Sequence, residues 1–101
     1  MLTSKQRAGL RAMAHGCDSL LYIGKDGITE TVVRQAEDAL KNNELIKVTV
    51  QKAAPLETRE ACDTLCEKIG ADPVQCIGRR FVLFRQAEDP EKRKIDLKKW
   101  R

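Results

Sequence analysis

The sequence predicts a compact α/β domain in which three helices and four strands follow one another in the order αβαβαββ. A chain of 101 residues can build one core. Three segments have apolar residues at helical spacing, and others have the shorter pattern of strands. The last two strands are separated only by the turn Gly78-Arg79-Arg80. So short a turn allows only an antiparallel hairpin, whereas strand–helix–strand crossovers join parallel strands, so we expect a mixed four-stranded sheet packed with helices.

The first helix is predicted from signals at its two ends. Thr3 suits the capping position, and Gln6 three residues later completes a capping-box pattern. The helix is expected to stop at His15 and Gly16, because glycine is favoured just after a helix cap. Residues 19–23 then read as a short buried strand.

The second helix is predicted to begin after Thr29 and to end at Asn42 and Asn43, with apolar residues three and four apart. Apolar and polar residues then alternate over residues 44–51, as is typical of a strand with one wetter face. Pro55 separates this strand from the next helix. The remaining elements are a third helix at residues 57–69, closed by Gly70, and hairpin strands at residues 73–77 and 81–85.

The domain is expected to occupy residues 1–85 and to be followed by a charged tail at residues 86–101. Ten of the sixteen tail residues are charged, so the segment has almost nothing to bury and is predicted to be mobile. Trp100 is the exception. The sequence leaves open whether it stacks on a base or packs back on the domain.

Composition limits the kind of protein. Charged residues make up 34% and hydrophobic residues 42% of the chain, and no apolar run is long enough to span a bilayer. The polar N-terminus lacks the apolar segment of a secretory signal, so we expect a cytoplasmic protein without a membrane partner. The net charge of +4 divides equally between residues 1–85 and 86–101, so a nucleic-acid surface must be one face of the domain.

Catalytic, cofactor and metal sites are not indicated. His15 is the one histidine and lies at a predicted helix end, where a cation that offsets the helix dipole is favoured over a base. We therefore expect no His-based metal cluster and no Ser-His pair. Cys62 and Cys66 lie on the apolar stripe of the third helix, where buried thiols are favoured over zinc ligands. The glycines at 24 and 27 lack the spacing of a nucleotide-hydrolase loop or a dinucleotide fingerprint. We therefore expect no enzyme, no cofactor and no small-molecule substrate.

The most informative functional signal is the Gly-x-x-Gly loop formed by Gly24, Lys25, Asp26 and Gly27, between an apolar strand and a helix start. Glycines let the main chain come close to a ligand. Exposed amides and the positive end of the helix favour a phosphate, and Lys25 adds a full charge. The structural alternative is a tight strand-to-helix turn without a ligand, because this motif alone is weak.

Other basic residues favour nucleic acid as the partner. Arg79 and Arg80 share a tight turn that presents at least one guanidinium to solvent, where it can contact phosphates. The further candidates are Lys5, Arg7 and Arg11 of the first helix and Lys47 of the second strand. Together with the loop these residues predict an RNA- or DNA-binding face, in which the first helix flanks the loop and the hairpin arginines extend it.

Four segments of the chain share a further pattern: Leu-Thr-Ser-Lys-Gln-Arg at residues 2–7, Ile-Gly-Lys-Asp-Gly-Ile-Thr at 23–29, Glu-Leu-Ile-Lys-Val at 44–48 and Ile-Gly-Arg-Arg at 77–80. In this order and spacing they resemble the CRM domain, the chloroplast RNA splicing and ribosome maturation module, which occurs in bacteria as the stand-alone YhbY-like protein. The resemblance covers residues 2 to about 85.

The resemblance implies an αβαβαββ fold similar to the C-terminal domain of translation initiation factor three. It also implies an RNA-binding assembly factor, without catalytic activity, for precursors of the large ribosomal subunit. The loop is similar to the Gly-x-x-Gly loop with which KH domains clamp the RNA backbone. By position, Gly24, Lys25 and Gly27 would form it. Asp26 departs from the neutral or glycine residue common in the family, and its carboxylate would repel phosphate.

Two other functions remain open. A protein-interaction module would dock on a ribosomal protein or another partner through the acidic third helix and the apolar hairpin, and it would depend on Glu60 or Asp63 rather than on Lys25. A small enzyme acting on RNA is least favoured, because no set of residues supplies a base, a nucleophile or a metal site. The chain is expected to act as a monomer.

Overall fold

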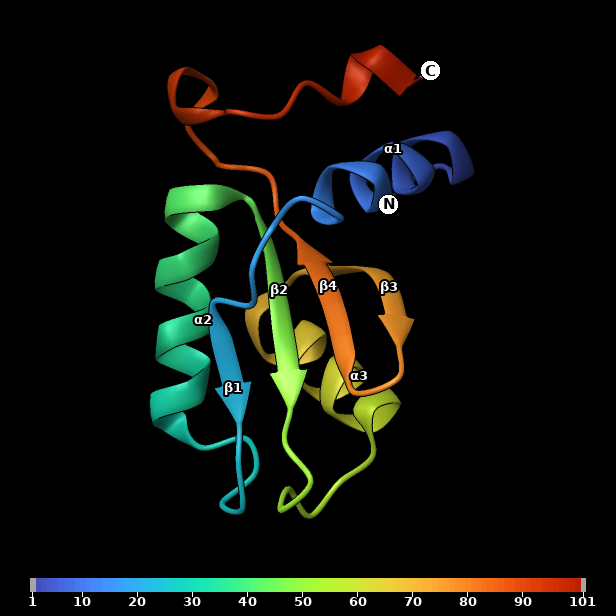
Figure 1. The fold of residues 1–101 in the computed structure, drawn as a ribbon. Coiled ribbons are helices and arrows are strands. Elements are labelled where there is room, and N and C mark those ends of the chain that lie inside the picture. Colours follow the sequence, from blue (N-terminus) through green and yellow to red (C-terminus); the bar gives the residue numbers. More distant parts are fainter. Residues whose placement is uncertain (1, 101) are drawn as a thin grey trace.

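The computed structural model describes residues 2–100, and within them it has the predicted order of elements (Figure 1). The elements are α1 (Ser4–Ala14), β1 (Leu21–Ile23), α2 (Glu30–Asn43), β2 (Leu45–Val50), α3 (Thr58–Ile69), β3 (Asp72–Ile77), β4 (Arg80–Phe84) and the short 3-10 helices η1 (Pro90–Lys92) and η2 (Leu97–Trp100). The sheet order is β1-β2-β4-β3, with β1 parallel to β2 and β4 antiparallel to both its neighbours. The predicted mixed sheet is therefore confirmed.

Helices α1 and α2 begin at the side chains that the sequence singles out. The Gln6 main-chain N–H donates to Thr3 Oγ1 (3.1 Å), and the Thr3 N–H donates to the Gln6 side chain (3.0 Å), which completes the capping box. At the start of α2, the Val32 N–H donates to Thr29 Oγ1 (3.2 Å). Within residues 2–100 no helix combines the length and the apolar character needed to cross a bilayer.

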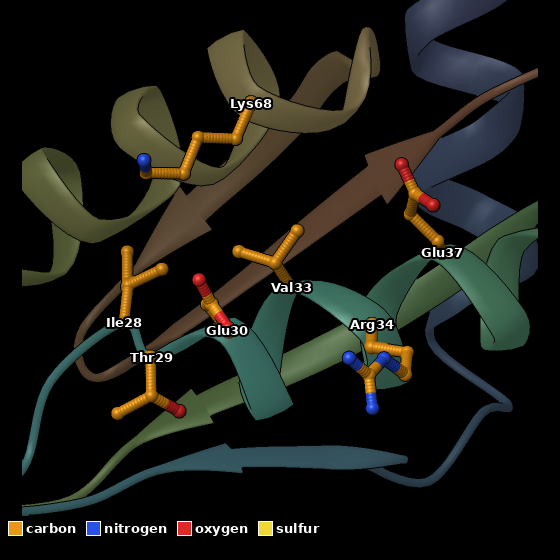
Figure 2. Close-up of a pocket in the computed structure, with 7 residues that line it drawn as sticks. All are labelled: Ile28, Thr29, Glu30, Val33, Arg34, Glu37 and Lys68. Atoms are coloured by element: carbon orange, nitrogen blue, oxygen red, sulfur yellow. The ribbon is translucent and has the colours of Figure 1, made fainter.

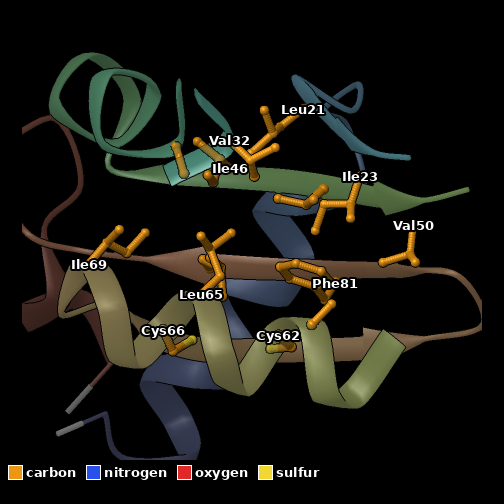
Figure 3. Packing of buried hydrophobic residues seen from close by; sticks show 14 of the residues in the cluster. Leu21, Ile23, Val32, Ile46, Val50, Cys62, Leu65, Cys66, Ile69 and Phe81 are labelled. Atoms are coloured by element: carbon orange, nitrogen blue, oxygen red, sulfur yellow. The ribbon is translucent and has the colours of Figure 1, made fainter. Parts of the chain in front are cut away.

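The larger core lies between the sheet and helices α2 and α3. Alternate residues of β2, namely Ile46, Val48 and Val50, face these helices and are almost fully buried. Figure 3 looks onto this side of the sheet, where Leu65 of α3 lies beside Phe81 of β4, and α1 lies behind the strands. The two crossover helices therefore cover one face of the sheet, and α1 belongs to the other.

The opposite face carries a second, smaller core. Leu10 and Ala14 of α1 pack there against side chains at the start of β2 and the end of β4, among them Leu45 and Phe84. Since α1 has 11 residues, it is about 16 Å long. It covers the end of the sheet at which β2 begins.

The cysteines of α3 are part of the larger core. Cys62 and Cys66 are buried, which confirms their interpretation as buried thiols. The hydrogen bond between the two thiols, together with burial, raises the pKa of Cys66, and burial also raises the pKa of Cys76 in β3. The thiols of Cys66 and Cys76 are therefore held in their neutral, protonated form.

The charged C-terminal segment packs on the second core. Ile95 is buried there, and Leu97 and Trp100 are partly buried against it. The indole of Trp100 lies directly over Gly9 of α1, where a Cβ would fall 2.0 Å from the ring. The prediction that this segment has almost nothing to bury is wrong, because Ile95, Leu97 and Trp100 lie among its charged residues and pack on the second core. The mobility of the segment and the domain boundary at residue 85 stay predictions.

A buried carboxylate holds this segment in place. Glu44 is 1% exposed and follows α2 in the left-handed conformation (φ 62°), with its N–H donating to the Leu40 carbonyl (2.8 Å). Its Oε1 accepts from the main-chain N–H groups of Lys94 (2.6 Å) and Ile95 (3.0 Å), and its Oε2 accepts from Ala87 (2.7 Å). One side chain thus satisfies three main-chain donors of the C-terminal segment.

Replacing Glu44 by glutamine should destabilise the protein. The amide keeps the size of the side chain but substitutes a donor for one acceptor oxygen, so a buried N–H group loses its partner. We expect the free energy of unfolding in urea to fall by about 1–3 kcal/mol. The exposed Glu88→Gln is the control and should change it by less than about 0.5 kcal/mol. Equal stability of Glu44→Gln and the wild type would contradict the importance of this carboxylate.

Candidate nucleic-acid interface

The Gly-x-x-Gly loop is a tight turn between β1 and α2. The Gly27 N–H donates to the Gly24 carbonyl (3.0 Å), and Gly27 has a left-handed conformation (φ 70°). This turn leaves Lys25 and Asp26 exposed at its tip. Gly27 itself is buried, and a Cβ there would lie 3.4 Å from Pro55 Cγ. The conformation that carries Lys25 into solvent therefore requires glycine at position 27.

The loop continues into the N-terminus of α2 and lines a shallow depression with it. The residues around the depression include the four of the loop, together with Thr29, Thr31, Val32, Gln51 and Ala53. The positive end of the α2 dipole favours an anion here. Lys25 adds a full positive charge, and Asp26 in the loop and Glu30 in the first turn of α2 oppose this attraction in part.

The segment after β2 runs beside this loop and brings a cation that the sequence analysis missed. The Gln51 N–H donates to the Ile23 carbonyl (2.9 Å), so the chain after β2 leaves the sheet next to the chain after β1. Lys52 follows at once and is exposed. The signal was the parallel pairing of β1 and β2, because residues after two parallel neighbours meet at the same edge of the sheet.

The hairpin arginines lie at the same end of the sheet as the loop. The Val50 N–H donates to the Arg79 carbonyl (2.6 Å), and Arg80 pairs with Thr49 of β2. Both arginines are exposed. Since β4 lies two strands from β1, about 10 Å separates them in the plane of the sheet. We call Lys25, Lys52, Arg79 and Arg80, with the two loop glycines, the basic end of the sheet.

The cations of α1 lie at the opposite end. The core of α1 is formed with Leu45 and Phe84, which stand at the start of β2 and the end of β4, and Figure 1 places α1 and the Gly-x-x-Gly loop at opposite ends of the strands. The six residues of β2 span about 20 Å. The expectation that Lys5, Arg7 and Arg11 flank the loop is therefore wrong. Nothing in the local sequence says to which end of the sheet a first helix returns.

The α1 cations differ among themselves. Lys5 and Arg11 are exposed, whereas Arg7 is half-buried and its Nε is buried without a hydrogen-bond partner among residues 2–100. Lys47 is half-buried in the middle of β2, between the two ends, on the face that carries α1. The involvement of these four residues in binding stays a prediction.

A second depression lies between α2 and α3 and does not suit an anion. Figure 2 shows Ile28 and Val33 within it and charged side chains around it. These are Glu30, Arg34, Glu37 and Lys68, two of each sign. Because the acidic and basic groups offset one another, this groove offers a phosphate no net attraction.

Within residues 2–100, no three His, Cys, Asp or Glu side chains gather closely enough to hold a metal ion. His15 is exposed at the end of α1. The chemistry available at the basic end of the sheet is the electrostatic binding of anions by main-chain N–H groups, ammonium groups and guanidinium groups.

The fold and this basic end define a small α/β domain that presents a Gly-x-x-Gly loop and an arginine hairpin on one edge of a mixed sheet. The sequence model of the CRS1/YhbY (CRM) domain matches residues 2–85, and the chain belongs to this family. It is 32% identical over 97 residues to the probable RNA-binding protein YqeI of Bacillus subtilis, covering 96% of this chain and 99% of YqeI.

Two further similarities agree with this assignment. An RNA-binding protein of Haemophilus influenzae is 36% identical over 89 residues, with 87% of this chain and 89% of that protein covered. The solution structure of the hypothetical protein SAV1595 from Staphylococcus aureus matches with a TM-score of 0.77 and 38% identity, over 95% of this chain and all of that one. The two named relatives are described as binding RNA, and neither name describes an enzyme.

The two loop glycines should respond differently to alanine. Gly27→Ala forces a Cβ into the left-handed region and should lower the free energy of unfolding by about 1–2 kcal/mol. At Gly24 a Cβ would meet only Gln51 Oε1, at 3.0 Å, which is the end of a flexible exposed side chain. Gly24→Ala should therefore change stability by less than about 0.5 kcal/mol. Urea unfolding measures both, and a larger loss for Gly24→Ala would contradict the turn described above.

Proposed function

We propose that the protein binds RNA through the basic end of its sheet. The observation that carries this proposal is the convergence of Lys25, Lys52 and the pair Arg79–Arg80 on one end of the sheet. They lie around a glycine-containing turn whose main chain a phosphate can approach closely. Three separate segments contribute, so the charge is gathered by folding. The names of the relatives from B. subtilis and H. influenzae support RNA as the partner.

The RNA bound is a ribosomal RNA or a precursor of the large ribosomal subunit, and the protein acts as a monomeric assembly factor in the cytoplasm without catalysis or a cofactor. This finer part of the proposal rests on the resemblance to the CRM family. Contacts of the kind described go to phosphates, and they position a protein on structured RNA without reading much of its sequence.

Asp26 tunes this interaction. It stands beside Lys25 at the exposed tip of the loop, so its carboxylate weakens the local positive potential. Replacing Asp26 by asparagine should accordingly strengthen binding.

The proposal predicts that RNA affinity falls steeply with increasing salt, and that Lys25 accounts for part of this dependence. With precursor large-subunit RNA, Lys25→Ala should weaken binding and lower the slope of log affinity against log salt by about 1, and the double change Arg79→Ala with Arg80→Ala should lower it by about 2. Titration of purified protein from low to moderate salt, with folding checked by circular dichroism, measures these slopes.

The matched control is Lys41→Ala. Lys41 is an exposed lysine in the last turn of α2, and the 14 residues of that helix place it about 20 Å from the loop. Its slope should stay that of the wild type. Affinity that barely changes with salt would overturn the proposal. Dependence of binding to the precursor particle on Glu60 and Asp63 alone would replace it by docking on a ribosomal protein.

Arg11→Ala tests the other end of the sheet. If one RNA contacts both ends of the sheet, the effect of Arg11→Ala on the binding free energy should add to that of Lys25→Ala, since Arg11 and Lys25 lie well apart. A slope unchanged by Arg11→Ala would restrict the interface to the basic end.

A further inference from the structure

Half of the sheet face that carries α1 has no helix over it. Tyr22 of β1 points to this face, because its neighbours Leu21 and Ile23 point into the larger core. Tyr22 is 56% exposed, and Ile77 of β3, on the other edge strand, is 62% exposed. Figure 1 shows the strands uncovered at the end near the loop, while α1 lies at the other end.

The residues of this open area form a row across all four strands. Tyr22 pairs with Thr49, Thr49 pairs with Arg80, and Arg80 pairs with Ile77. Partners in register point to the same face, so the phenol ring, the guanidinium and the isoleucine side chain stand on one surface. Arg80 also belongs to the basic end of the sheet, so the open area is continuous with the proposed interface.

The main chain at Tyr22 is held by β2, the one strand beside β1. The Gln51 N–H bond to Ile23 and the Leu20 N–H bond to the Lys47 carbonyl (3.0 Å) hold β1 on β2 at both ends. The hydroxyls of Ser19 and Thr49 share a hydrogen bond (2.6 Å) on the same strand pair. An aromatic ring on a fixed strand loses little conformational entropy when a partner binds it.

The charge around Tyr22 selects the partner. Lys47 stands diagonally across β1 and β2 from Tyr22, a separation of about 7–8 Å that long side chains can bridge, and Arg80 stands two strands away. The exposed or half-buried residues of this area are Leu20, Tyr22, Lys47, Thr49, Gln75, Ile77 and Arg80, and none is acidic. Both cations lie on the side of Tyr22 toward the middle of the sheet, so a base stacked on the ring would have its neighbouring phosphates on that side.

We propose that this open half of the sheet binds single-stranded RNA, with one unpaired base stacked on Tyr22 and its flanking phosphates held by Lys47 and Arg80. The proposal rests on the proposed function and adds a second mode of contact to it. The loop end holds backbone phosphate of structured RNA, whereas the Tyr22 area needs a base that is free of its helix. A site of both kinds fits a junction between a helix and a single strand.

Affinity for a single-stranded oligouridine of about eight nucleotides tests the proposal. Tyr22→Ala should weaken binding by about five- to 150-fold, the range found when one base loses its aromatic partner. Tyr22→Phe keeps the ring and should stay within about twofold of the wild type. Tyr22→Leu keeps apolar area without a ring and should lose most of the affinity. The control is Met13→Ala, which removes an apolar side chain of α1 that is 43% exposed and should leave the affinity for oligouridine unchanged.

Tyrosine fluorescence gives a second, direct readout. Tyr22 is the only tyrosine and Trp100 the only tryptophan of the chain, so in a Trp100→Phe background the emission comes from Tyr22. A stacked base should quench it as oligouridine is added, and a duplex RNA of equal length should not. Circular dichroism checks that the background variant folds, and the affinities above are measured independently in the natural chain.

The outcomes separate this proposal from the proposed function. Loss of oligouridine binding and of quenching with Tyr22→Ala, and retention with Tyr22→Phe, supports the stacking site. Wild-type affinity of Tyr22→Ala for oligouridine, together with weakened binding of Lys25→Ala to precursor RNA, overturns the stacking site and leaves the proposed function in place. Equal affinities of Tyr22→Leu and the wild type also overturn stacking. Failure of the wild type to bind either RNA overturns both.

Discussion

The parallel pairing of β1 with β2 is the constraint on which the rest of this structure depends. It brings the chain after β1, which is the Gly-x-x-Gly loop, beside the chain after β2, which carries Lys52. Because β4 runs antiparallel to β2, the β3–β4 turn with Arg79 falls at that same end. The main-chain bond from Val50 to Arg79 fixes this neighbourhood. Strand direction, set by the two crossover helices and one hairpin, thus brings cations from three segments to one end of the sheet.

The opposite end of the sheet is organised by Glu44. A non-glycine residue in the left-handed conformation is strained. At Glu44 this conformation turns the chain sharply from α2 into β2 and places the side chain in the interior of the protein. The buried carboxylate is compensated by three main-chain donors of the C-terminal segment. Trp100 then lies on Gly9 of α1. The helix, the turn and the C-terminal segment consequently stabilise one another.

Local patterns predicted the elements, and long-range pairing decided the site. Capping at Thr3 and Thr29, the apolar stripe around Cys62 and Cys66, and the hairpin at Gly78 are all set by neighbours in the sequence, and the structure agrees with them. The placement of α1 away from the loop depends on which end of the sheet exposes apolar side chains such as Phe84, which no local pattern encodes. The role of Glu44 was missed because a charged residue is ordinarily exposed and the partners of this one lie far along the chain. Lys52 was missed because its place beside the loop depends on the pairing of β1 with β2.

The open half of the sheet explains how so small a domain can leave strands uncovered. A sheet face needs a helix over it when its side chains are apolar, as at Leu45, Val82 and Phe84, which α1 and Ile95 cover. Toward the loop the same strands carry Lys47, Thr49 and Arg80, which water solvates, so no cover is required. Two of the polar residues that make a fourth helix unnecessary, Lys47 and Arg80, also place positive charge on the side of Tyr22 toward the middle of the sheet. Solubility of the uncovered face and attraction for a phosphate backbone therefore arise from the same side chains.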